Sequence, residues 1–278
     1  MYKRVLTVQD ISCVGKCSLT VALPIISAMG VETAIIPTAV LSTHTMFQGF
    51  TVKDLTDQVK PIGEHWKKEN FAFDAIYTGY LGSFEQIDLM KEMFEDFKTE
   101  SNLIFVDPAM ADNGKLYPAF DEAFAKYMGT LCAKADIIVP NMTEASFMTG
   151  IEYKEIYDEA YAKEMLRALT AMGAKIAILT GVSFEEGTTG VMGYDSAKDE
   201  FYYYKHPKHP VSYHGTGDIF SSTCVGAMMN GMDWKEAVAV AADYTSECIR
   251  VTYEDPNAIT YGVNFESVIP YLLKRFGK

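Results

Sequence analysis

The chain has few arginines, no paired cysteine motif and no long apolar run. Only four of its 24 basic residues are arginine, so we expect no arginine cluster that clamps a phosphate group. The five cysteines form no C-x-x-C pair, and their odd number is typical of reduced thiols. No apolar stretch approaches the roughly 20 residues of a membrane span, and residues 2–8 are too short and polar for a secretory signal. We therefore expect a soluble, cytoplasmic protein.

Acidic residues dominate the charge. The chain has 37 Asp and Glu and a net charge of −13, which argues against a surface for nucleic acid or an anionic membrane. With 49% hydrophobic and 22% charged residues, its composition is that of a globular enzyme. We see no linker, repeat or low-complexity run, so we expect one domain over residues 1–278. If this protein handles phosphate, it must use backbone amides, scattered lysines and a metal.

Short apolar runs alternate with helical patterns along the whole chain. The expected strands are residues 5–8, 31–36, 75–78, 103–106, 137–139 and 176–180, with a hairpin of 189–194 and 200–204. The expected helices are residues 18–29, 52–68, 84–98, 119–131, 143–149, 157–172, 217–230, 234–251 and 264–276. Ser18 and Thr51 are the expected caps of the first two helices, and residues 9–16 form a polar turn. This order predicts an α/β fold with a mostly parallel sheet covered by helices on both faces.

The stretch His214-Gly215-Thr216-Gly217-Asp218 precedes an uncharged run that predicts a buried helix. Glycine permits the positive φ angles and the close backbone approach that a tight entry turn needs. Free amides at a helix start, with the positive end of the helix dipole, form an anion site. An aspartate there would repel a phosphate, but it could accept a proton. We therefore predict that the amides hold an anion and that Asp218 acts as a base.

Polar residues also follow the predicted strands, at the edge of the sheet where ligands bind in this fold class. Asp107, Asn141 and Glu144 carry oxygen ligands of the kind that Mg²⁺ uses while it retains several waters. Each has an alternative interpretation. Asp107 precedes a proline and could be a turn residue, and the pair Asn141-x-x-Glu144 could be a helix cap. Cys13 and Cys17 have the spacing of half a metal site but no nearby partner, which favours small buried thiols.

The order of these blocks resembles the pyridoxal kinases of the ribokinase superfamily. The blocks that carry the resemblance are Gly79-Tyr80-Leu81-Gly82-Ser83, Asp107-Pro108-Ala109-Met110, Pro140-Asn141-x-x-Glu144, Leu179-Thr180 and Gly215-Thr216-Gly217-Asp218. The segment Leu41-Ser42-Thr43-His44-Thr45 is also similar to that family's substrate-side segment. The resemblance covers nearly the whole chain. It implies a ribokinase-like three-layer sandwich, a homodimer, and the ATP- and Mg²⁺-dependent phosphorylation of the primary 5′-hydroxyl of a vitamin B6 vitamer.

The resemblance also implies a role for each matching residue. Asp218 would take the proton from the substrate hydroxyl, and the amides of Gly215, Thr216 and Gly217 would form the anion hole. The residues implied to hold Mg²⁺ or its waters are Asp107, Asn141 and Glu144. Those implied to bind ATP are Asn141, Glu144, Thr180, Thr216 and Gly217. Thr180 would lie beside the ATP phosphates or a monovalent cation such as K⁺. The hairpin near Tyr194–Tyr203 and the helix with Ile249 would border the adenine.

The substrate pocket is where the chain departs from the family pattern. Thr45, Tyr80 and Asp218 match the family's substrate side. Many pyridoxal kinases have a serine directly after the glutamine of the first strand end, whereas here Asp10 follows Gln9 and Ser12 comes two places later. Asp10 either contacts the ring nitrogen, phenol or amine of the substrate, or is a solvated turn residue.

Two other functions stay open on the sequence alone. A hydroxymethylpyrimidine kinase of the same superfamily would share the fold and the base, although the Gly-Tyr-Leu-Gly-Ser block favours B6. A non-catalytic vitamer-binding protein would have no use for a carboxylate beside an anion hole. A sugar kinase is disfavoured because no inserted β lid follows the first strand.

Overall fold

The computed structural model describes residues 2–277, which form eleven strands and nine helices. The strands are β1 (Arg4–Val14), β2 (Glu32–Thr43), β3 (Val52–Asp54), β4 (Ala75–Thr78), β5 (Leu103–Val106), β6 (Ala111–Asp112), β7 (Lys115–Leu116), β8 (Ile137–Ile138), β9 (Ile176–Val182), β10 (Thr188–Asp195) and β11 (Glu200–Pro207). The helices are α1 (Leu19–Ala28), α2 (Thr56–Lys68), α3 (Phe84–Phe97), α4 (Glu122–Cys132), α5 (Met142–Thr149), α6 (Glu159–Ala171), α7 (Thr216–Met229), α8 (Trp234–Glu254) and α9 (Phe265–Lys274).

Nine strands form one sheet in the order β11-β10-β9-β8-β5-β4-β1-β2-β3. The six strands from β9 to β2 run parallel to their neighbours, whereas β3 at one edge and the β10–β11 hairpin at the other are antiparallel. The carboxyl ends of the parallel strands therefore meet at one edge of the sheet, where the predicted functional residues follow them. The predicted mostly parallel sheet and its terminal hairpin are confirmed.

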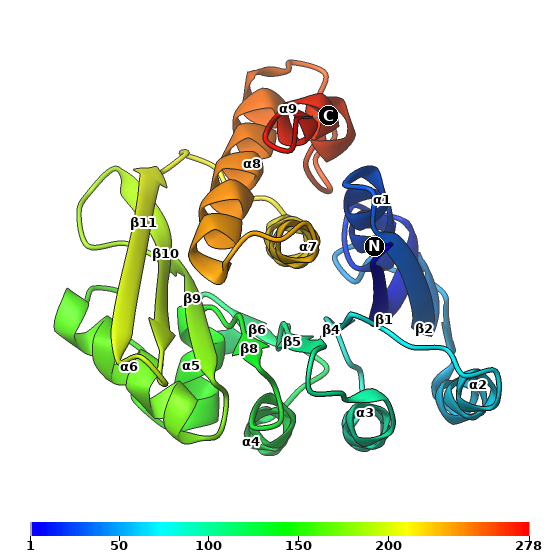
Figure 1. Cartoon of the computed structure of the whole chain (residues 1–278). Coiled ribbons are helices and arrows are strands. Elements are labelled where there is room, and N and C mark those ends of the chain that lie inside the picture. Colours follow the sequence, from blue (N-terminus) through cyan, green and yellow to red (C-terminus); the bar gives the residue numbers. More distant parts are fainter. Residues whose placement is uncertain (1, 278) are drawn as a thin grey trace.

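The sheet lies between two layers of helices (Figure 1). Helices α2 to α6 cover one face, and α1, α7, α8 and α9 cover the other. Alternate residues of each central strand point to opposite faces, so Leu6 and Ile76 join the core under α2 to α6, whereas Val5 and Tyr77 pack with α7 and α8. Burial on both faces explains why these strands appear in the sequence as continuous apolar runs. The predicted three-layer sandwich is confirmed.

The first two strands are longer than the sequence indicated. The predicted turn over residues 9–16 is wrong for most of its length, because β1 continues to Val14 and pairs with β2 up to Thr43. The predicted end of the second strand at Pro37 is also wrong. Pro37 lies opposite Gln9, where the register shifts before Ile11 pairs with Val40. A proline is tolerated there because it lacks only a ladder N–H at an irregular point.

The predicted helix over 52–68, capped by Thr51, begins too early. Residues Val52–Asp54 form the edge strand β3, which pairs with β2, and α2 begins at Thr56. The cap also differs. The N-cap residue is Leu55, which makes no side-chain capping bond, and the side chain of Asp54 before it accepts a hydrogen bond from the amide of Thr56 at 2.8 Å. A short hairpin of β6 and β7 after β5 was not predicted at all.

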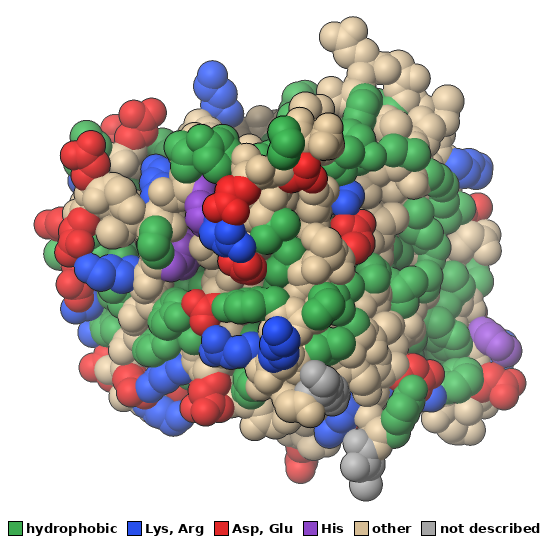
Figure 2. Space-filling view, turned by 90° about the horizontal axis from the view of Figure 1, so that it is seen from above, with side chains coloured by type: hydrophobic (Ala, Val, Ile, Leu, Met, Phe, Trp, Pro, Cys, Tyr) green, Lys and Arg blue, Asp and Glu red, His purple; other side chains and the backbone are tan. Residues whose placement is uncertain are grey.

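Other features of the chain are visible at its surface. Figure 2 shows the face that carries α8 and α9, on which charged side chains of both signs gather mainly on the left and apolar side chains cover a broad area on the right. Among the helices of residues 2–277, none is long and apolar enough to cross a membrane. Cys17 is buried, as predicted, but Cys13 is exposed, so the prediction of a buried thiol is wrong there.

Candidate active site

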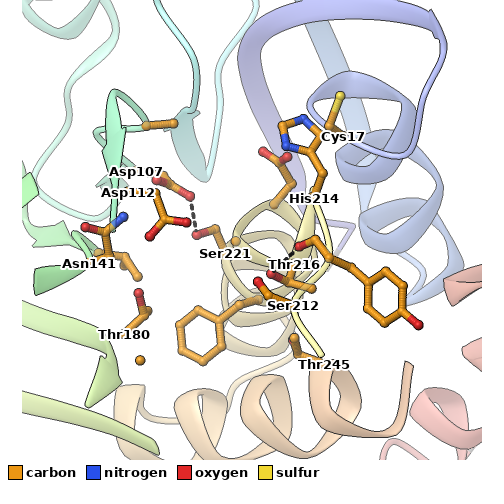
Figure 3. A pocket seen from close by; sticks show the side chains of 18 of the residues that line it. Cys17, Asp107, Asp112, Asn141, Thr180, Ser212, His214, Thr216, Ser221 and Thr245 are labelled. Carbon is orange, nitrogen blue, oxygen red and sulfur yellow. Dashed lines mark hydrogen bonds between the residues drawn. The ribbon is translucent and has the colours of Figure 1, made fainter. Parts of the chain in front are cut away.

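A cavity of about 420 Å³ lies at the carboxyl ends of the parallel strands and brings together every site residue predicted from the sequence. These residues are Asp10, Ser12, Thr45, Tyr80, Asp107, Asn141, Glu144, Thr180, Gly215, Thr216, Gly217 and Asp218. Figure 3 shows Asp107, Asn141 and Thr180 on one side of the pocket and Cys17 and His214 on the other, with Thr216 and Ser221 from α7 between them. Within the described part of the chain, the lining contains no lysine or arginine.

The first turn of α7 requires glycine at position 215. Gly215 has a φ of +82°, and a Cβ built there would lie 1.8 Å from the carbonyl oxygen of Lys16. The turn therefore packs directly on the backbone that leads into α1. Helix α7 begins at Thr216, and the amides of a helix's first turn have no acceptor within the helix. Those of Thr216 and Gly217 belong to residues that line the cavity, where they are available to an anion.

Asp218 occupies the first turn of α7 and faces the same cavity. Its removal from water, together with the negative charges of Asp107 and Asp10, raises its pKa to about 8. The backbone amide of Ser18, at the start of α1, donates a hydrogen bond to this carboxylate and lowers the pKa in part. Asp218 is therefore a carboxylate whose proton affinity suits a general base near neutral pH.

Asp107 and Glu144 form a buried acidic pair. Burial raises the pKa of Asp107 to about 6, although Ser221 of α7 donates a 2.7 Å hydrogen bond to it (Figure 3). Burial and the charge of Asp107 raise the pKa of Glu144 well above its ordinary value. The interpretation of Asp107 as a mere turn aspartate is insufficient, because its side chain is buried against α7 and lines the cavity.

The helix-cap interpretation of Asn141 and Glu144 is correct. The two side chains form a complete capping box at the start of α5, in which each accepts a hydrogen bond from the backbone amide of the other. Glu144 also accepts a hydrogen bond from the amide of Met110 at 3.1 Å, and Asn141 donates to the carbonyl of Ala111 at 2.7 Å. These bonds tie the chain after β5 to the start of α5. They leave the predicted metal-binding role of this pair untested.

The donor set nevertheless fits a divalent cation. Asp107 and Glu144 are buried carboxylates that repel each other, and no lysine or arginine of the described lining offsets them. Mg²⁺ commonly binds through one or two carboxylates, with waters and phosphate oxygens filling the other positions. Within residues 2–277, no group of three or more His, Cys, Asp or Glu side chains could hold a metal by itself. A cation here would therefore share its coordination with a bound phosphate.

Asp10 is not a solvated turn residue, so that alternative is wrong. It lies within β1 with only 5% of its surface exposed, and burial raises its pKa. Ser12 donates a hydrogen bond to it at 3.1 Å, and the side chain of Ser18 donates another. Ser18 does hold the cap position of α1, but its side chain forms no capping bond because it is directed to Asp10.

Aromatic and histidine side chains line the cavity near Asp10. Tyr80 packs against Phe120 with ring centroids 5.5 Å apart, and burial with the charge of Asp10 raises its pKa to about 12. His44 is buried, and its ring lies 4.5 Å from that of His214. Burial and His44 lower the pKa of His214 to about 4, so His214 is neutral at physiological pH.

On the opposite side of the cavity, Thr180 ends the parallel part of β9 and forms a β-bridge with Asn141. The predicted border by Tyr194–Tyr203 differs from the observed lining, to which the hairpin contributes residues 189–191 of β10 and His206 of β11. Tyr194 stacks on Phe201, with ring centroids 4.4 Å apart. Ile249 of α8 lines the cavity, as expected for that helix.

Several residues of the site were missed in the sequence. Ser221 lies three residues after Asp218, so it shares a face of α7 with the predicted base, and this spacing could have indicated it. Cys17, Ser18 and His214 carry no such signal. They reach the cavity only because α1 and the turn before α7 pack against each other.

Comparisons with known proteins agree with this arrangement. A family model described as phosphomethylpyrimidine kinase matches residues 23–264. The pyridoxal kinase of Dictyostelium discoideum is 27% identical over 242 residues, which cover 81% of this chain and 78% of the relative. Among solved structures, pyridoxal kinase from Lactobacillus plantarum is 30% identical with a TM-score of 0.91, covering 99% of this chain and 98% of that one. A candidate phosphomethylpyrimidine kinase from Bacteroides thetaiotaomicron, in a crystal form with pyridoxal, is 38% identical with a TM-score of 0.93, covering 98% and 96%.

Proposed function

The chain belongs to the phosphomethylpyrimidine kinase family and is a kinase of ribokinase-like fold, and from this premise we propose that it transfers the γ-phosphoryl group of ATP to the primary 5′-hydroxyl of a vitamin B6 vitamer. One observation carries the proposal. Asp218, with its pKa raised to about 8, stands in the same helix turn as the amides of Thr216 and Gly217, inside a cavity large enough for a small heteroaromatic substrate.

Asp218 acts as the general base in this proposal. Its carboxylate accepts the proton of the substrate hydroxyl as that oxygen attacks the γ-phosphorus. The hydrogen bond from the Ser18 amide orients the ionised carboxylate of Asp218 before proton transfer. The amides at the start of α7 stabilise the negative charge on the transferring group, and the helix dipole adds to that effect. A non-catalytic vitamer-binding protein is disfavoured by the family assignment as well as by this carboxylate.

Asp107 and Glu144 are the residues we propose to hold Mg²⁺, directly or through its waters, and when bound this ion would offset the charge of the ATP phosphates. Asn141 keeps Glu144 in place through the capping box, and Ser221 orients Asp107. The described lining contains no lysine or arginine to compete for these carboxylates, which supports their proposed role as the cation-binding groups. Thr180 lies next to Asn141 and would contact the nucleotide phosphates or a monovalent cation.

The substrate side of the cavity supports a B6 vitamer. Asp10, Ser12 and Tyr80 offer a buried carboxylate, a hydroxyl and an aromatic ring around one small region. The protein from Bacteroides thetaiotaomicron, which crystallised with pyridoxal, is the relative that adds weight to this substrate class. Asp10 would accept a hydrogen bond from the ring nitrogen or an amine of the substrate. Thr45 is exposed at the mouth of the cavity, where it would contact bound substrate.

Steady-state assays with Mg²⁺-ATP test the proposal directly. Pyridoxal, pyridoxamine, pyridoxine and hydroxymethylpyrimidine are supplied in turn, and the phosphorylated product is measured by chromatography. We expect turnover of at least one B6 vitamer. No product from any of the three vitamers would refute the proposal.

Hydroxymethylpyrimidine phosphorylation is the second candidate, because the family model itself is described by the pyrimidine reaction. The same assay separates the two candidates through the ratio of kcat/KM values. A higher value for hydroxymethylpyrimidine than for every vitamer would establish the pyrimidine function. The homodimer implied by the sequence resemblance stays a prediction, which the mass of the protein in solution tests.

A further inference from the structure

A cluster of polar side chains lies beneath the cavity, between the sheet and α7. Gln9 of β1, Tyr77 of β4 and Ser222 of α7 are each fully buried. None of them is among the residues that line the cavity. Helix α7 lies over the middle of the sheet (Figure 1), and the phenol of Tyr77 in that sheet interacts with Ser222 of α7.

The register of the sheet explains how they meet. Tyr77 pairs with Thr7 of β1, so both side chains point toward α7. Gln9 lies two residues after Thr7, on the same face of the strand, and donates to the hydroxyl of Thr7 at 2.9 Å. A Cβ at Gly79 would lie 2.7 Å from Cδ of Gln9. The missing side chain at Gly79 therefore lets the Gln9 amide lie across the neighbouring strand.

The cluster is linked to both halves of the proposed catalytic machinery, through α7 and through the charges of Asp107 and Asp218. Ser222 lies four residues after Asp218, one helix turn further along the same face of α7. The phenol of Tyr77 interacts with Ser222 and Gln9, and the charges of Asp107 and Asp218 both act on it. Ser221, next to Ser222, holds Asp107. A shift of α7 on Tyr77 would therefore move the proposed base relative to the proposed metal ligand.

The polar atoms of the cluster are not fully satisfied. Within residues 2–277, Oε1 of Gln9, the hydroxyl of Tyr77 and Oγ of Ser222 lack a partner at full hydrogen-bond geometry, although Tyr77 lies beside the other two. Buried polar atoms without partners are rare and each calls for an explanation. Hydrogen bonds that serve catalysis are often long or misaligned in the ligand-free enzyme and tighten in the reacting complex. A small movement of α7 toward the sheet would complete these bonds.

We propose that Tyr77, with Gln9 and Ser222, is a positioning residue that seats the first turn of α7 and so places Asp218 for proton transfer. This inference rests on the proposed kinase function. Tyr77 touches no substrate and acts only through α7. Its hydroxyl should therefore matter for the chemical step and not for the binding of ATP or of the second substrate.

The variants Tyr77→Phe and Ser222→Ala test the proposal in the full-length enzyme. Because misplacement of a catalytic group by a fraction of an ångström to 1 Å costs up to 10²-fold, we expect kcat to fall by about tenfold in each variant. Both KM values should stay within about twofold of wild type, since only an interaction specific to the transition state is lost. The thermal midpoint should be unchanged or higher, because each variant removes an unsatisfied buried hydroxyl.

Thr78→Val is the matched control. The hydroxyl of Thr78 is also fully buried and unpartnered among the described residues, but Thr78 follows Tyr77 by one position and points to the opposite face of the sheet. We expect its kcat to match wild type. The proposal is overturned if Tyr77→Phe and Ser222→Ala keep the wild-type kcat, if KM rises instead of kcat falling, or if Thr78→Val loses kcat to the same extent. Each kcat is compared with that of the wild type, measured with the substrate that the wild type turns over best. Failure of this proposal is therefore distinct from an absence of vitamer turnover in the wild-type enzyme.

Discussion

Replacing Gly215 with alanine should disturb the start of α7 more than a glycine-to-alanine replacement elsewhere in the site. The backbone φ of Gly215 is +82°, and the added Cβ would lie 1.8 Å from the carbonyl oxygen of Lys16 and 2.9 Å from its carbonyl carbon. The opposing atoms belong to the backbone, so no change of rotamer relieves the contact. The turn or the segment before α1 must move.

The size of the effect follows from two costs and one gain. A left-handed conformation costs an alanine roughly 1–2 kcal/mol, and a forced shift of packed atoms costs about 1–3 kcal/mol. Alanine restricts the unfolded chain, which offsets roughly 0.4–1 kcal/mol. We therefore expect Gly215→Ala to lower the free energy of unfolding by about 2–4 kcal/mol. Because the same turn carries Asp218 and the amides proposed to bind an anion, a displacement of about 1 Å should lower kcat by roughly 10²-fold.

Gly150→Ala separates the conformational cost from the steric one. Gly150 ends α5 with a φ of +77°, and nothing lies within 4 Å of its Cβ position. This control should lose only about 1 kcal/mol and keep its kcat. Urea unfolding measures the stability of both variants, and saturating ATP and vitamer give kcat. Equal unfolding free energies for the two variants, with wild-type kcat in Gly215→Ala, would refute the steric argument.

Four further predictions concern the carboxylates. Asp218→Asn should lower kcat by about 10²–10⁴-fold while ATP still binds, and near-normal turnover would remove Asp218 from its role as base. In the wild type, kcat/KM should fall as pH decreases through about 8, because Asp218 gains a proton there and can no longer act as a base. A kcat/KM that stays constant between about pH 6 and about pH 9 would contradict that role. The raised pKa means that the folded protein favours the protonated form of Asp218, so the stability that this proton contributes is lost as pH rises through about 8. The thermal midpoint of ligand-free Asp218→Asn should therefore exceed that of the wild type by more at high pH than at low pH. Asp10→Ser should change the relative kcat/KM values for pyridoxal, pyridoxamine and pyridoxine, and unchanged ratios would exclude Asp10 from substrate recognition.

Local sequence patterns were sufficient for the fold class and for much of the site. The apolar runs of the central strands are buried on both faces, so they stand out in the sequence without any tertiary information. Residues that follow parallel strands must meet at one edge of the sheet, which is why Asp107, Asn141 and Thr180 could be grouped in advance. The glycine turn before Asp218 was equally visible, because its conformation is a property of the residue itself.

The sequence alone did not predict how far neighbouring strands pair. Residues 9–14 resemble a polar turn because Gln9, Asp10 and Ser12 interrupt the apolar run, yet β1 extends through them since β2 supplies a partner as far as Thr43. The same error made Asp10 look exposed, whereas its strand carries it into the interior. Val52–Asp54 became a strand rather than a helix start for the same reason, because β2 offers an open edge there.

What the sequence determined, then, is the order of elements, the glycine turn before Asp218 and the polar residues after several strands, all of which depend on a few neighbouring residues. Only the tertiary structure decided their energetics. The raised pKa of Asp218 arises from burial and from Asp107 and Asp10, which lie more than a hundred residues away in the chain. The contact of Gly215 with the Lys16 carbonyl, and the polar cluster under α7, exist only because α1, α7 and the sheet are packed together. Such effects depend on the distance between residues in space, which their separation along the chain does not reveal.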